Sequence, residues 1–444
     1  MRPAGRHAVV IGGSIAGTAA AQTLSSRFEN VTVIDRDAFP DSPRSRRGVP
    51  QSEHAHGLLI SGRIALDELF PQFTDELVNG GAVPFDPGTD VLFFQMGGFR
   101  ARIPTGMLGV SASRAFLEHR MRRRIEGTDN VRIRDGLTAQ GLTAASGRVT
   151  GLELSNGETL PADLVVNATG RNSGRLEKWL AQLGCAAPDT ASVRINVRYT
   201  TRIFHRVPGD DLHKGGLFSV VAPHPPGDGR AAALAAIEGD RWMVTLGGWH
   251  GAEAPTDLDG FRQFAAELPH PHVAELLARA EPIGDAHTYQ TPTAQRRYFE
   301  RLRVVPSGFV ALGDAICSFN PVYGQGMTVA LLEARELGHC LDRFGTPSEA
   351  MAREYYRRIG KVIDTPWQMA TGGDFMFPQT TGRKPRGTDL VNRYARQVML
   401  ASQLSPELHL VLLRMQHLLD PPTAMFRPGT VLRTLRTRRA TGTR

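Results

Sequence analysis

The sequence predicts an α/β fold: a Rossmann-like parallel sheet built from separated segments, a mostly antiparallel sheet inserted between them, and helices towards the C-terminus. Two observations support this prediction. Glycine-rich turns follow apolar strand-like runs near the N-terminus and again after residue 312, and each turn leads into a helix-like run. Between them, residues 190–250 are rich in strand-forming runs without helical periodicity.

The first motif begins with a buried-strand run at residues 8–11, followed by the turn Gly12-Gly13-Ser14-Ile15-Ala16-Gly17 and an Ala-rich helix to about residue 24. A second strand at residues 31–34 ends in Asp35, about 20 residues beyond the glycines, where an acid binds ribose hydroxyls in dinucleotide folds. Ser14 replaces the second glycine of the usual pattern, so its Cβ would crowd a pyrophosphate slightly while its hydroxyl could donate to it. The unit predicts a dinucleotide site.

The second motif reads Gly313-Asp314-Ala315, then Asn320-Pro321, then Gly324-Gln325-Gly326-Met327, with a helix expected from 328 to 341. The acid can accept hydrogen bonds from cofactor hydroxyls. The glycines allow backbone N–H groups to approach a cofactor closely, at the positive end of a helix. A third strand, at residues 162–167, ends in the small-residue turn Ala168-Thr169-Gly170, where backbone can also pack against a nucleotide.

Composition limits the class of protein. The chain has 444 residues, enough for two or three domains, and its formal net charge is +8. Its three cysteines form no Cys-x-x-Cys pair, which favours neither a disulfide framework nor a metal site and fits a reducing compartment. No run has the length and apolarity of a membrane span, so we expect a cytoplasmic protein without an integral membrane segment.

The basic residues are scattered, except for a few short runs and the tail from Arg427 to Arg444, which holds six arginines and no acid. This tail is interpreted as a solvated, partly disordered end, with an anionic partner or membrane surface as the alternative. Nothing indicates nucleic-acid binding, because no aromatic residues are interleaved with the charges.

The remaining elements give the domain organisation. A helix is expected to open at residues 53–59, another at 113–117, and a hairpin at 149–160. The region 348–419 is predicted to be helical with interruptions at Pro366, at Gly372-Gly373 and between 378 and 387. The predicted domains are a nucleotide-binding domain at 1–79, 106–187 and 296–345, a substrate domain at 80–105 and 188–295, and a C-terminal helical region with the basic tail at 346–444.

At this point the chain resembles the single-component, group A FAD-dependent monooxygenases of the para-hydroxybenzoate hydroxylase type. The resemblance rests on Gly12-x-Ser14-x-x-Gly17 with Asp35, on Asp163 with Ala168-Thr169-Gly170, and on Gly313-Asp314-Ala315 with Pro321 and Gly324-x-Gly326. Within that group it is most similar to actinobacterial polyene epoxidases of polyether pathways, the monensin and lasalocid type. Those similarities are the runs from Arg47 to His56, Ser113-Arg114-x-x-Leu117, Phe319 to Met327, and Asp364-x-Pro366-Trp367.

The resemblance implies a bound FAD, with NADPH or NADH as transient co-substrate and O2 as oxidant. Asp35 would bind the adenosine ribose, Arg114 the ribityl-phosphate region, and Asp314 the ribityl or pyrophosphate portion. The implied cofactor-binding residues are Gly12, Ser14, Gly17, Asp35, Arg36, Arg47, Arg114, Gly170, Asp314, Pro321, Gly324, Gly326 and Met327. His54 and His56 are interpreted either as flavin-side residues or as ordinary hydrogen-bonding residues, and Cys317 as a small buried filler.

The implied reaction is epoxidation of one or more alkenes of an apolar polyketide or terpenoid intermediate in natural-product biosynthesis. Oxygen would come from a flavin C4a-hydroperoxide, so no catalytic side chain is assigned. The pocket is expected between the inserted sheet and the flavin. Its candidate residues are Phe94, Phe218, Trp242, Phe319 and Tyr323, with Phe93, Trp249 and Trp367 as further aromatic candidates, although each could be an ordinary core residue.

Three alternatives stay open: hydroxylation of an aromatic polyketide, saturation of prenyl chains by a flavin-dependent reductase, and a flavin-bound sensor without enzymatic activity. A halogenase is disfavoured because the sequence contains no Trp-x-Trp-x-Ile-Pro run.

Overall fold

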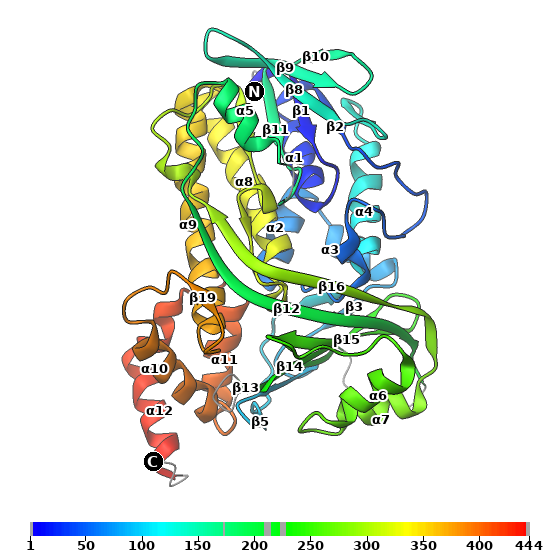
Figure 1. Cartoon of the computed structure of the whole chain (residues 1–444), viewed down its shortest axis with the longest axis vertical. Helices are drawn as coiled ribbons and strands as arrows, with labels where there is room; N and C mark the ends of the chain where they lie inside the picture. Colours follow the sequence, from blue (N-terminus) through cyan, green and yellow to red (C-terminus); the bar gives the residue numbers. More distant parts are fainter. Residues whose placement is uncertain (1–2, 172–173, 208–214, 223–227, 441–444) are drawn as a thin grey trace.

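The computed structural model describes residues 3–171, 174–207, 215–222 and 228–440. The last four residues of the basic tail lie outside this range. Figure 1 shows the N-terminus and the parallel sheet at one end of the molecule and the C-terminal helices at the other. The long strands β12 (Thr190–His205) and β16 (Pro282–Arg297) run between them.

The parallel sheet has five strands in the order β17-β11-β1-β2-β7. Its strands come from four separated parts of the chain: β1 (Gly5–Ile11), β2 (Phe28–Ile34), β7 (Val131–Arg134), β11 (Leu164–Asn167) and β17 (Phe309–Ala311). All four strand pairs are parallel. In β1, β2, β11 and β17 consecutive residues are buried on both faces, which explains the continuous apolar runs in the sequence, whereas the edge strand β7 is only partly buried. This confirms the discontinuous Rossmann-like prediction.

The second large sheet has nine strands, with the order β18-β16-β12-β15-β14-β13-β4-β5 and β19 paired to β12. Besides β12 and β16, its strands are β4 (Val91–Gln95), β5 (Gly98–Phe99), β13 (Gly216–Ala222), β14 (Asp228–Ile237), β15 (Arg241–Trp249), β18 (Cys317–Ser318) and β19 (Thr381–Gly382). Pairing is antiparallel except between β13 and β4 in the described residues. The predicted inserted, mostly antiparallel sheet is confirmed.

Two small sheets complete the strands. The predicted hairpin belongs to the sheet formed by β8 (Ala139–Ala145), β9 (Arg148–Leu154) and β10 (Thr159–Pro161), and β3 (Val83–Phe85) pairs with β6 (Gly109–Ser111). The helices of the first part are α1 (Ile15–Ser25), α2 (Ile60–Leu69), α3 (Phe73–Asn79), α4 (Arg114–Glu126) and α5 (Leu176–Gln182). The later helices are α6 (Leu258–Ala266), α7 (His272–Arg279), α8 (Gly326–Phe344), α9 (Glu349–Asp374), α10 (Thr388–Ala401), α11 (Pro406–Gln416) and α12 (Pro428–Ala440).

One expected helix begins later than predicted. Residues 54–59 are extended and α2 starts only at Ile60, after a single 3-10 turn at Pro50–Glu53. The extended conformation is fixed from outside the segment: the buried His54 ring packs edge-on against Tyr199, and the Leu59 N–H donates to the Thr328 hydroxyl. These tertiary contacts hold the segment out of the helix that its sequence pattern predicted.

The helix α9 corrects another expectation, because it runs unbroken through Pro366 and Gly372-Gly373. Pro366 donates no backbone hydrogen bond, and a proline inside a helix costs about 3 kcal/mol. Burial of Ile363 and Trp367 on either side of the proline offsets that cost. The predicted break between 378 and 387 does interrupt the helices, and a second break, which was not predicted, separates α10 from α11 at residues 402–405. The basic tail is also helical as far as Ala440, as α12, rather than a disordered end.

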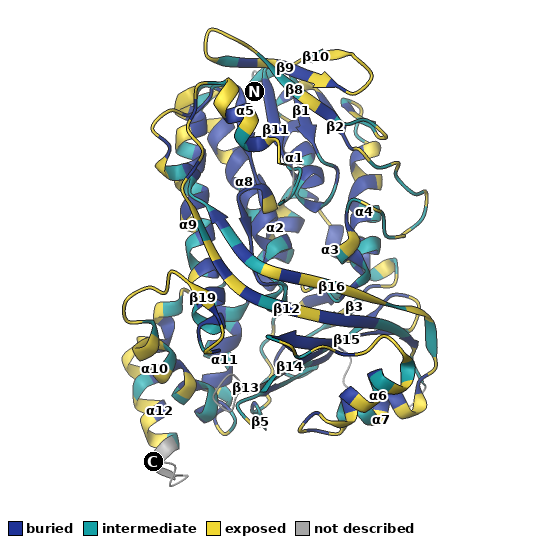
Figure 2. Ribbon diagram, viewed as in Figure 1, coloured by how far each residue is buried: buried dark blue, intermediate teal, exposed yellow. Residues whose placement is uncertain are grey.

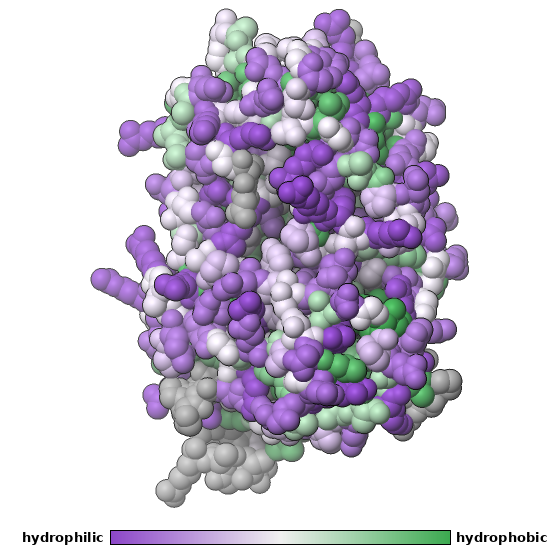
Figure 3. All heavy atoms as spheres, turned by 45° about the vertical axis from the view of Figure 1, so that its right-hand side comes forward, coloured by the Kyte–Doolittle hydropathy of each residue, from purple (hydrophilic) through white to green (hydrophobic). Residues whose placement is uncertain are grey.

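Buried residues occur in all parts of the molecule (Figure 2), and their hydrophobic side chains form three clusters. The largest surrounds the parallel sheet with α1, α4, α8 and α9. A second lies between one face of the nine-stranded sheet and the amphipathic helices α6 and α7, and a third lies among the C-terminal helices. The surface in Figure 3 is mainly hydrophilic, with scattered hydrophobic side chains. No helix in the described part of the chain combines the length and apolarity needed to cross a bilayer.

Candidate functional site

Two large cavities meet inside the molecule. The glycine-rich cleft, about 580 Å³, lies where β1, β2, β11 and β17 end and α8 begins. The apolar cavity, about 490 Å³, lies between the nine-stranded sheet and the C-terminal helices. Both are lined by seven residues that form a shared wall: Ala55, His56, Gly57, Tyr199, Pro321, Gly324 and Gln325. The site is therefore a pair of adjoining chambers.

The N-terminal motif forms one end of the cleft. The Gly13 N–H donates to Asp35 Oδ2 at 2.7 Å, and Arg46 Nη1 donates to Asp35 Oδ1 at 3.1 Å. Gly12, at φ 102°, lines the cleft. Gly17 does not, because it packs α1 against β1: a Cβ there would lie 1.7 Å from the Gly12 oxygen. The prediction that Gly17 surrounds a cofactor is thus corrected to a packing role.

A buried ionic network holds the side of the cleft next to Ser14. The Ser14 hydroxyl donates to Glu118 Oε1 at 2.6 Å, and Arg114 donates to both Glu118 (2.8 Å) and Ser14 (3.0 Å). Arg46 joins the network 3.7 Å from the other Glu118 oxygen. Sequence reasoning assigned Arg47 and missed Arg46, although both line the cleft. The arginine-rich loop carried the signal, but it does not show which of its side chains turn inward.

Asp314 is a carboxylate with no hydrogen-bond donor among the described residues. Its side chain is exposed to the cleft, yet it lies deep in the protein. Burial raises the pKa of Asp314, and the charges of Arg114 and Arg171 oppose that rise. Beneath it, the Gly313 N–H donates to Glu333, whose pKa burial raises to about 8. An unpaired acid facing an enclosed space is suited to accept hydrogen bonds from ligand hydroxyls.

The other end of the cleft is mostly backbone. Helix α8 begins at Gly326, so its positive N-terminus faces the cleft. Gly324 has φ 63°, and its nearest neighbours are the backbone atoms of Gly57. Pro321 and Met327 also line this end. All the assigned cofactor-binding residues except Gly17 therefore lie around one cleft.

Two observations show that the residues of the cleft fit a dinucleotide. The first is the unpaired Asp314 carboxylate, which could accept from ribityl or ribose hydroxyls. The second is a set of arginines that line the same cleft as the N-terminus of α8, a combination that complements the negative charge of a pyrophosphate. These are Arg36, Arg46, Arg47, Arg114, Arg171 and Arg175.

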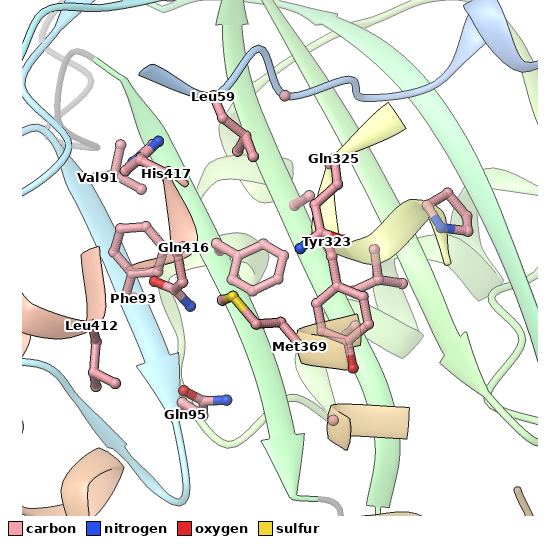
Figure 4. A pocket seen from close by; sticks show the side chains of 18 of the residues that line it. Leu59, Val91, Phe93, Gln95, Tyr323, Gln325, Met369, Leu412, Gln416 and His417 are labelled. Atoms are coloured by element: carbon pink, nitrogen blue, oxygen red, sulfur yellow. The ribbon is translucent and has the colours of Figure 1, made fainter. Parts of the chain in front are cut away.

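The apolar cavity is lined by one face of the nine-stranded sheet (Figure 4). Phe218 and Tyr323 line it as predicted, and so do Phe93 and Trp249. Phe94 and Trp242 do not, which corrects their assignment. Alternate residues of a strand point to opposite faces, so Phe93 faces the cavity while Phe94 packs on Phe99 and His270 behind the sheet.

The other aromatic candidates lie elsewhere. Trp242 is fully buried in the cluster with α6 and α7. Phe319 lines the glycine-rich cleft rather than the apolar cavity. Trp367 is a core residue that lines neither chamber.

The opposite wall of the apolar cavity comes from residues 368–425, none of which the sequence prediction assigned to the pocket. It is rich in methionine, whose flexible side chain adapts to irregular apolar shapes. The lining methionines are Met369, Met376, Met399, Met415 and Met425. Five of the twelve methionines in the chain lie in this wall, and that concentration after residue 368 was a usable signal.

His56 is part of the shared wall, and its hydrogen bonding defines its tautomer. Its Nδ1 lies 2.9 Å from the His54 carbonyl oxygen, which can only accept, so Nδ1 carries the proton and Nε2 is an acceptor. Burial and then the charge of Arg114 lower the pKa of His56 to about 3. The ring therefore stays neutral at physiological pH.

Asp374, the last residue of α9, connects the two chambers through hydrogen bonds. One of its oxygens accepts from Asn320 Nδ2 (2.6 Å), Trp249 Nε1 (3.0 Å) and Tyr323 OH (3.3 Å). Burial raises the pKa of Asp374 to about 7, and these hydrogen bonds oppose the rise. The network ties the Asn320-Pro321 turn of the cleft to two aromatic residues of the apolar cavity. Sequence reasoning missed Asp374 because its partners lie 51 to 125 residues away.

No group of three or more His, Cys, Asp or Glu side chains able to hold a metal ion occurs in the described ranges. The three cysteines are buried and unbonded to one another. Burial raises the pKa of Cys317 well above its usual value, as suits an inert filler.

Among known proteins, the chain is 32% identical over 438 residues to protein Rv3254 of Mycobacterium tuberculosis. The match covers 93% of this chain and 90% of that protein. The chain belongs to the family of Rv3254. No protein-family model matches it.

Solved structures show which fold the chain has. The chain superposes on a flavoprotein/dehydrogenase from Cytophaga hutchinsonii with a TM-score of 0.68 at 17% identity, covering 99% of this chain and 100% of that one. The TM-score with PqsL, a probable FAD-dependent monooxygenase from Pseudomonas aeruginosa, is 0.60 at 17% identity, covering 84% and 98%. It is also 0.60 with the flavin-dependent brominase Bmp2, at 13% identity, covering 99% and 98%. The chain therefore has a fold like that of FAD-dependent monooxygenases such as PqsL.

Proposed function

We propose that this protein is an FAD- and NAD(P)H-dependent monooxygenase that epoxidises an alkene of an apolar polyketide or terpenoid intermediate in natural-product biosynthesis. The observation that carries the proposal is the junction of the two chambers. A glycine-rich cleft suited to a dinucleotide shares one wall with a large apolar cavity. The flavin chemistry named for PqsL, which has the same fold, supports the choice of cofactor.

In this proposal FAD occupies the glycine-rich cleft. Asp35 binds the adenosine ribose, Arg46 and the N-terminus of α8 face the pyrophosphate, and Asp314 accepts from the ribityl chain. FAD, when bound, supplies the redox chemistry, which is to accept a hydride from NAD(P)H and to activate O2.

The protein's own contribution is enclosure and orientation. Gly57 and Gly324 bring two backbone segments close together in the wall that both chambers share. The phenylalanines and methionines of the apolar cavity exclude water and hold an apolar chain against the shared wall. An alkene needs no proton removed before oxygen is added, so the absence of a charged base in the shared wall suits it.

Aerobic incubation of the purified protein with NADPH and linear polyenes, followed by mass spectrometry, tests the proposal. The expected product is heavier by one oxygen atom for each epoxide, with the label taken from ¹⁸O2. A product that has gained two hydrogens instead would indicate the prenyl-chain reductase. Ligand-independent NADPH oxidation without any product would favour the sensor.

A second candidate is hydroxylation of a phenol, and His56 is the observation that favours it. Its unprotonated Nε2 could accept a hydrogen bond from a phenol hydroxyl at the junction of the chambers. A phenolic polyketide assayed beside a polyene distinguishes the two. Faster oxygenation of the phenol, lost in His56→Phe, would replace the epoxidase proposal.

A further inference from the structure

A buried cation that has no counter-ion among the described residues lies in the apolar cavity. Arg100 follows β5, lines the cavity and is only 5% exposed. Its guanidinium donates to the side-chain oxygens of Gln95 and Gln416, the latter at 2.9 Å, and lies 5.3 Å from the centre of the Phe93 ring. Its Nε has no hydrogen-bond partner in the part of the chain that the structure describes. Neither glutamine carries a charge, so the positive charge is solvated only by neutral groups.

The described residues offer no acid to this cation. Arg100 makes no ion pair with them, and burial alone lowers its pKa to about 10, so the group is still protonated at neutral pH. The neighbouring His409 does not compensate: burial and then the charge of Arg100 lower the His409 pKa to about 4, which leaves that ring neutral. An isolated buried ion costs several kcal/mol, which a fold bears where a ligand supplies the missing charge.

The position of Arg100 matters as much as its charge. Gln95 is on β4 and Gln416 ends α11, so the cluster bridges the sheet to the C-terminal helices. Figure 4 shows both glutamines on the side of Phe93 and Leu412, across the cavity from Tyr323 and Gln325. Tyr323 neighbours the shared wall that Gln325 helps to form. The cation therefore lies away from the glycine-rich cleft, at the other side of an apolar space.

We propose that Arg100, Gln95 and Gln416 form a subsite for a carboxylate at one end of an otherwise apolar substrate. This deepens the proposed function: the carboxylate is held on the far side of the cavity while the apolar chain extends to the shared wall. Arg100 keeps three of its five N–H donors. Because both glutamine oxygens face Arg100, their amide N–H groups are also free to donate to the ligand.

The single positive charge selects a carboxylate over a phosphate. A carboxylate carries one negative charge and balances Arg100, whereas a phosphate monoester carries nearly two at neutral pH and would leave an excess buried charge. A neutral alcohol or ester would leave Arg100 uncompensated. The cavity should therefore distinguish ligands that share a chain and differ only in the end group.

Equilibrium binding of matched C18 probes tests this subsite without any turnover. α-Linolenic acid, α-linolenyl alcohol and the corresponding alkyl phosphate are titrated into the purified holoprotein at neutral pH, with binding followed by calorimetry. We expect the acid to bind at least about tenfold more tightly than the alcohol, about 1.4 kcal/mol. In Arg100→Met that preference disappears while alcohol binding is retained, and in Arg100→Lys part of the preference returns.

The control variant is Arg102→Met, which removes an exposed arginine two residues away that does not line the cavity. It should keep the full preference for the acid. Equal affinity for acid and alcohol in the native protein would overturn the subsite, as would an undiminished preference in Arg100→Met. Tighter binding of the alkyl phosphate would overturn the carboxylate assignment. Because the readout is binding, a protein that binds the acid but oxygenates nothing would refute the proposed function alone.

Discussion

At the scale of the residue, two neighbouring acids have different roles: one is placed to bind a ligand, and the other affects the stability of the fold. Asp314 faces the glycine-rich cleft without a donor, whereas Glu333 lies fully buried beneath it and accepts the Gly313 N–H. The motif that contains Asp314 could be predicted from sequence because its residues are consecutive. Glu333 could not, because a single acid in a helical run is normally a surface residue.

Replacing Asp314 by alanine should therefore reduce cofactor content more than stability. We expect Asp314→Ala to purify with less than about a tenth of the flavin of the native protein, a loss of at least about 1.4 kcal/mol in binding. Absorbance near the flavin maximum, per mole of protein, measures this. The circular dichroism spectrum should be unchanged. A fully flavinated Asp314→Ala would contradict the role given to this carboxylate.

Glu333 should make stability depend on pH. Its pKa is about 8 in the folded protein, against 4.5 as the ordinary value, so the unfolded chain loses this proton first. Between these two values the unfolded state is favoured increasingly as pH rises, and stability falls. Glu333→Gln keeps an acceptor for Gly313 and removes the titration. Its melting temperature should fall less than that of the native protein between about pH 5 and about pH 8. Parallel melting curves over that interval would exclude this account.

At the scale of the element, the local sequence pattern predicted helices and strands correctly where tertiary packing favoured the same structure. The glycine turn, α1 and β2 were predicted nearly to their ends, because the Rossmann-like unit is encoded within about 30 residues. The extended segment 54–59 and the unbroken α9 were missed, because distant side chains decide both. The same limit applies to Phe94 and Trp242: alternation shows that strand neighbours face apart, but not which face borders the cavity.

Gly17 provides an element-level test, since it allows α1 to approach β1. Gly17→Ala places a Cβ 1.7 Å from the Gly12 oxygen, and we expect a loss of about 3 kcal/mol or more in unfolding free energy. Gly429→Ala is the matched control in α12, where an added Cβ meets nothing within 4 Å. Its stability should stay within about 0.5 kcal/mol of the native value. Urea denaturation of both variants makes the comparison, and equal stabilities would contradict the packing role of Gly17.

At the scale of the whole molecule, the two chambers draw on different parts of the chain. The glycine-rich cleft is lined only by residues up to Ala330 among those described. The apolar cavity adds a wall from α9 to the 3-10 turn at Pro422–Phe426. Sequence analysis predicted the part of the first chamber that its motifs form, but not Arg46 or the lining residues outside the motifs, such as Tyr199 and Tyr289. It predicted only the sheet side of the second, because α10 and α11 carry no motif and their inward faces emerge from packing.

A bulky side chain at the edge of the apolar cavity should affect only ligand binding. Val391 lines the cavity and is 42% exposed, while its neighbour Leu390 is 72% exposed and does not line it. We expect Val391→Trp to weaken binding of α-linolenic acid by about tenfold, with flavin content unchanged, and Leu390→Trp to leave both unchanged. Calorimetric titration of the two variants checks this. Equal effects at both positions would show that the C-terminal wall does not border the ligand.

The separate linings of the two chambers also affect how related proteins can differ. Residues 388–425 contribute to the lining of the apolar cavity and, among the described residues, not to that of the glycine-rich cleft. A substitution there can therefore change the shape of the apolar cavity and leave the lining of the cleft unchanged. Overall identity between two proteins built in this way should predict a common cofactor better than a common substrate.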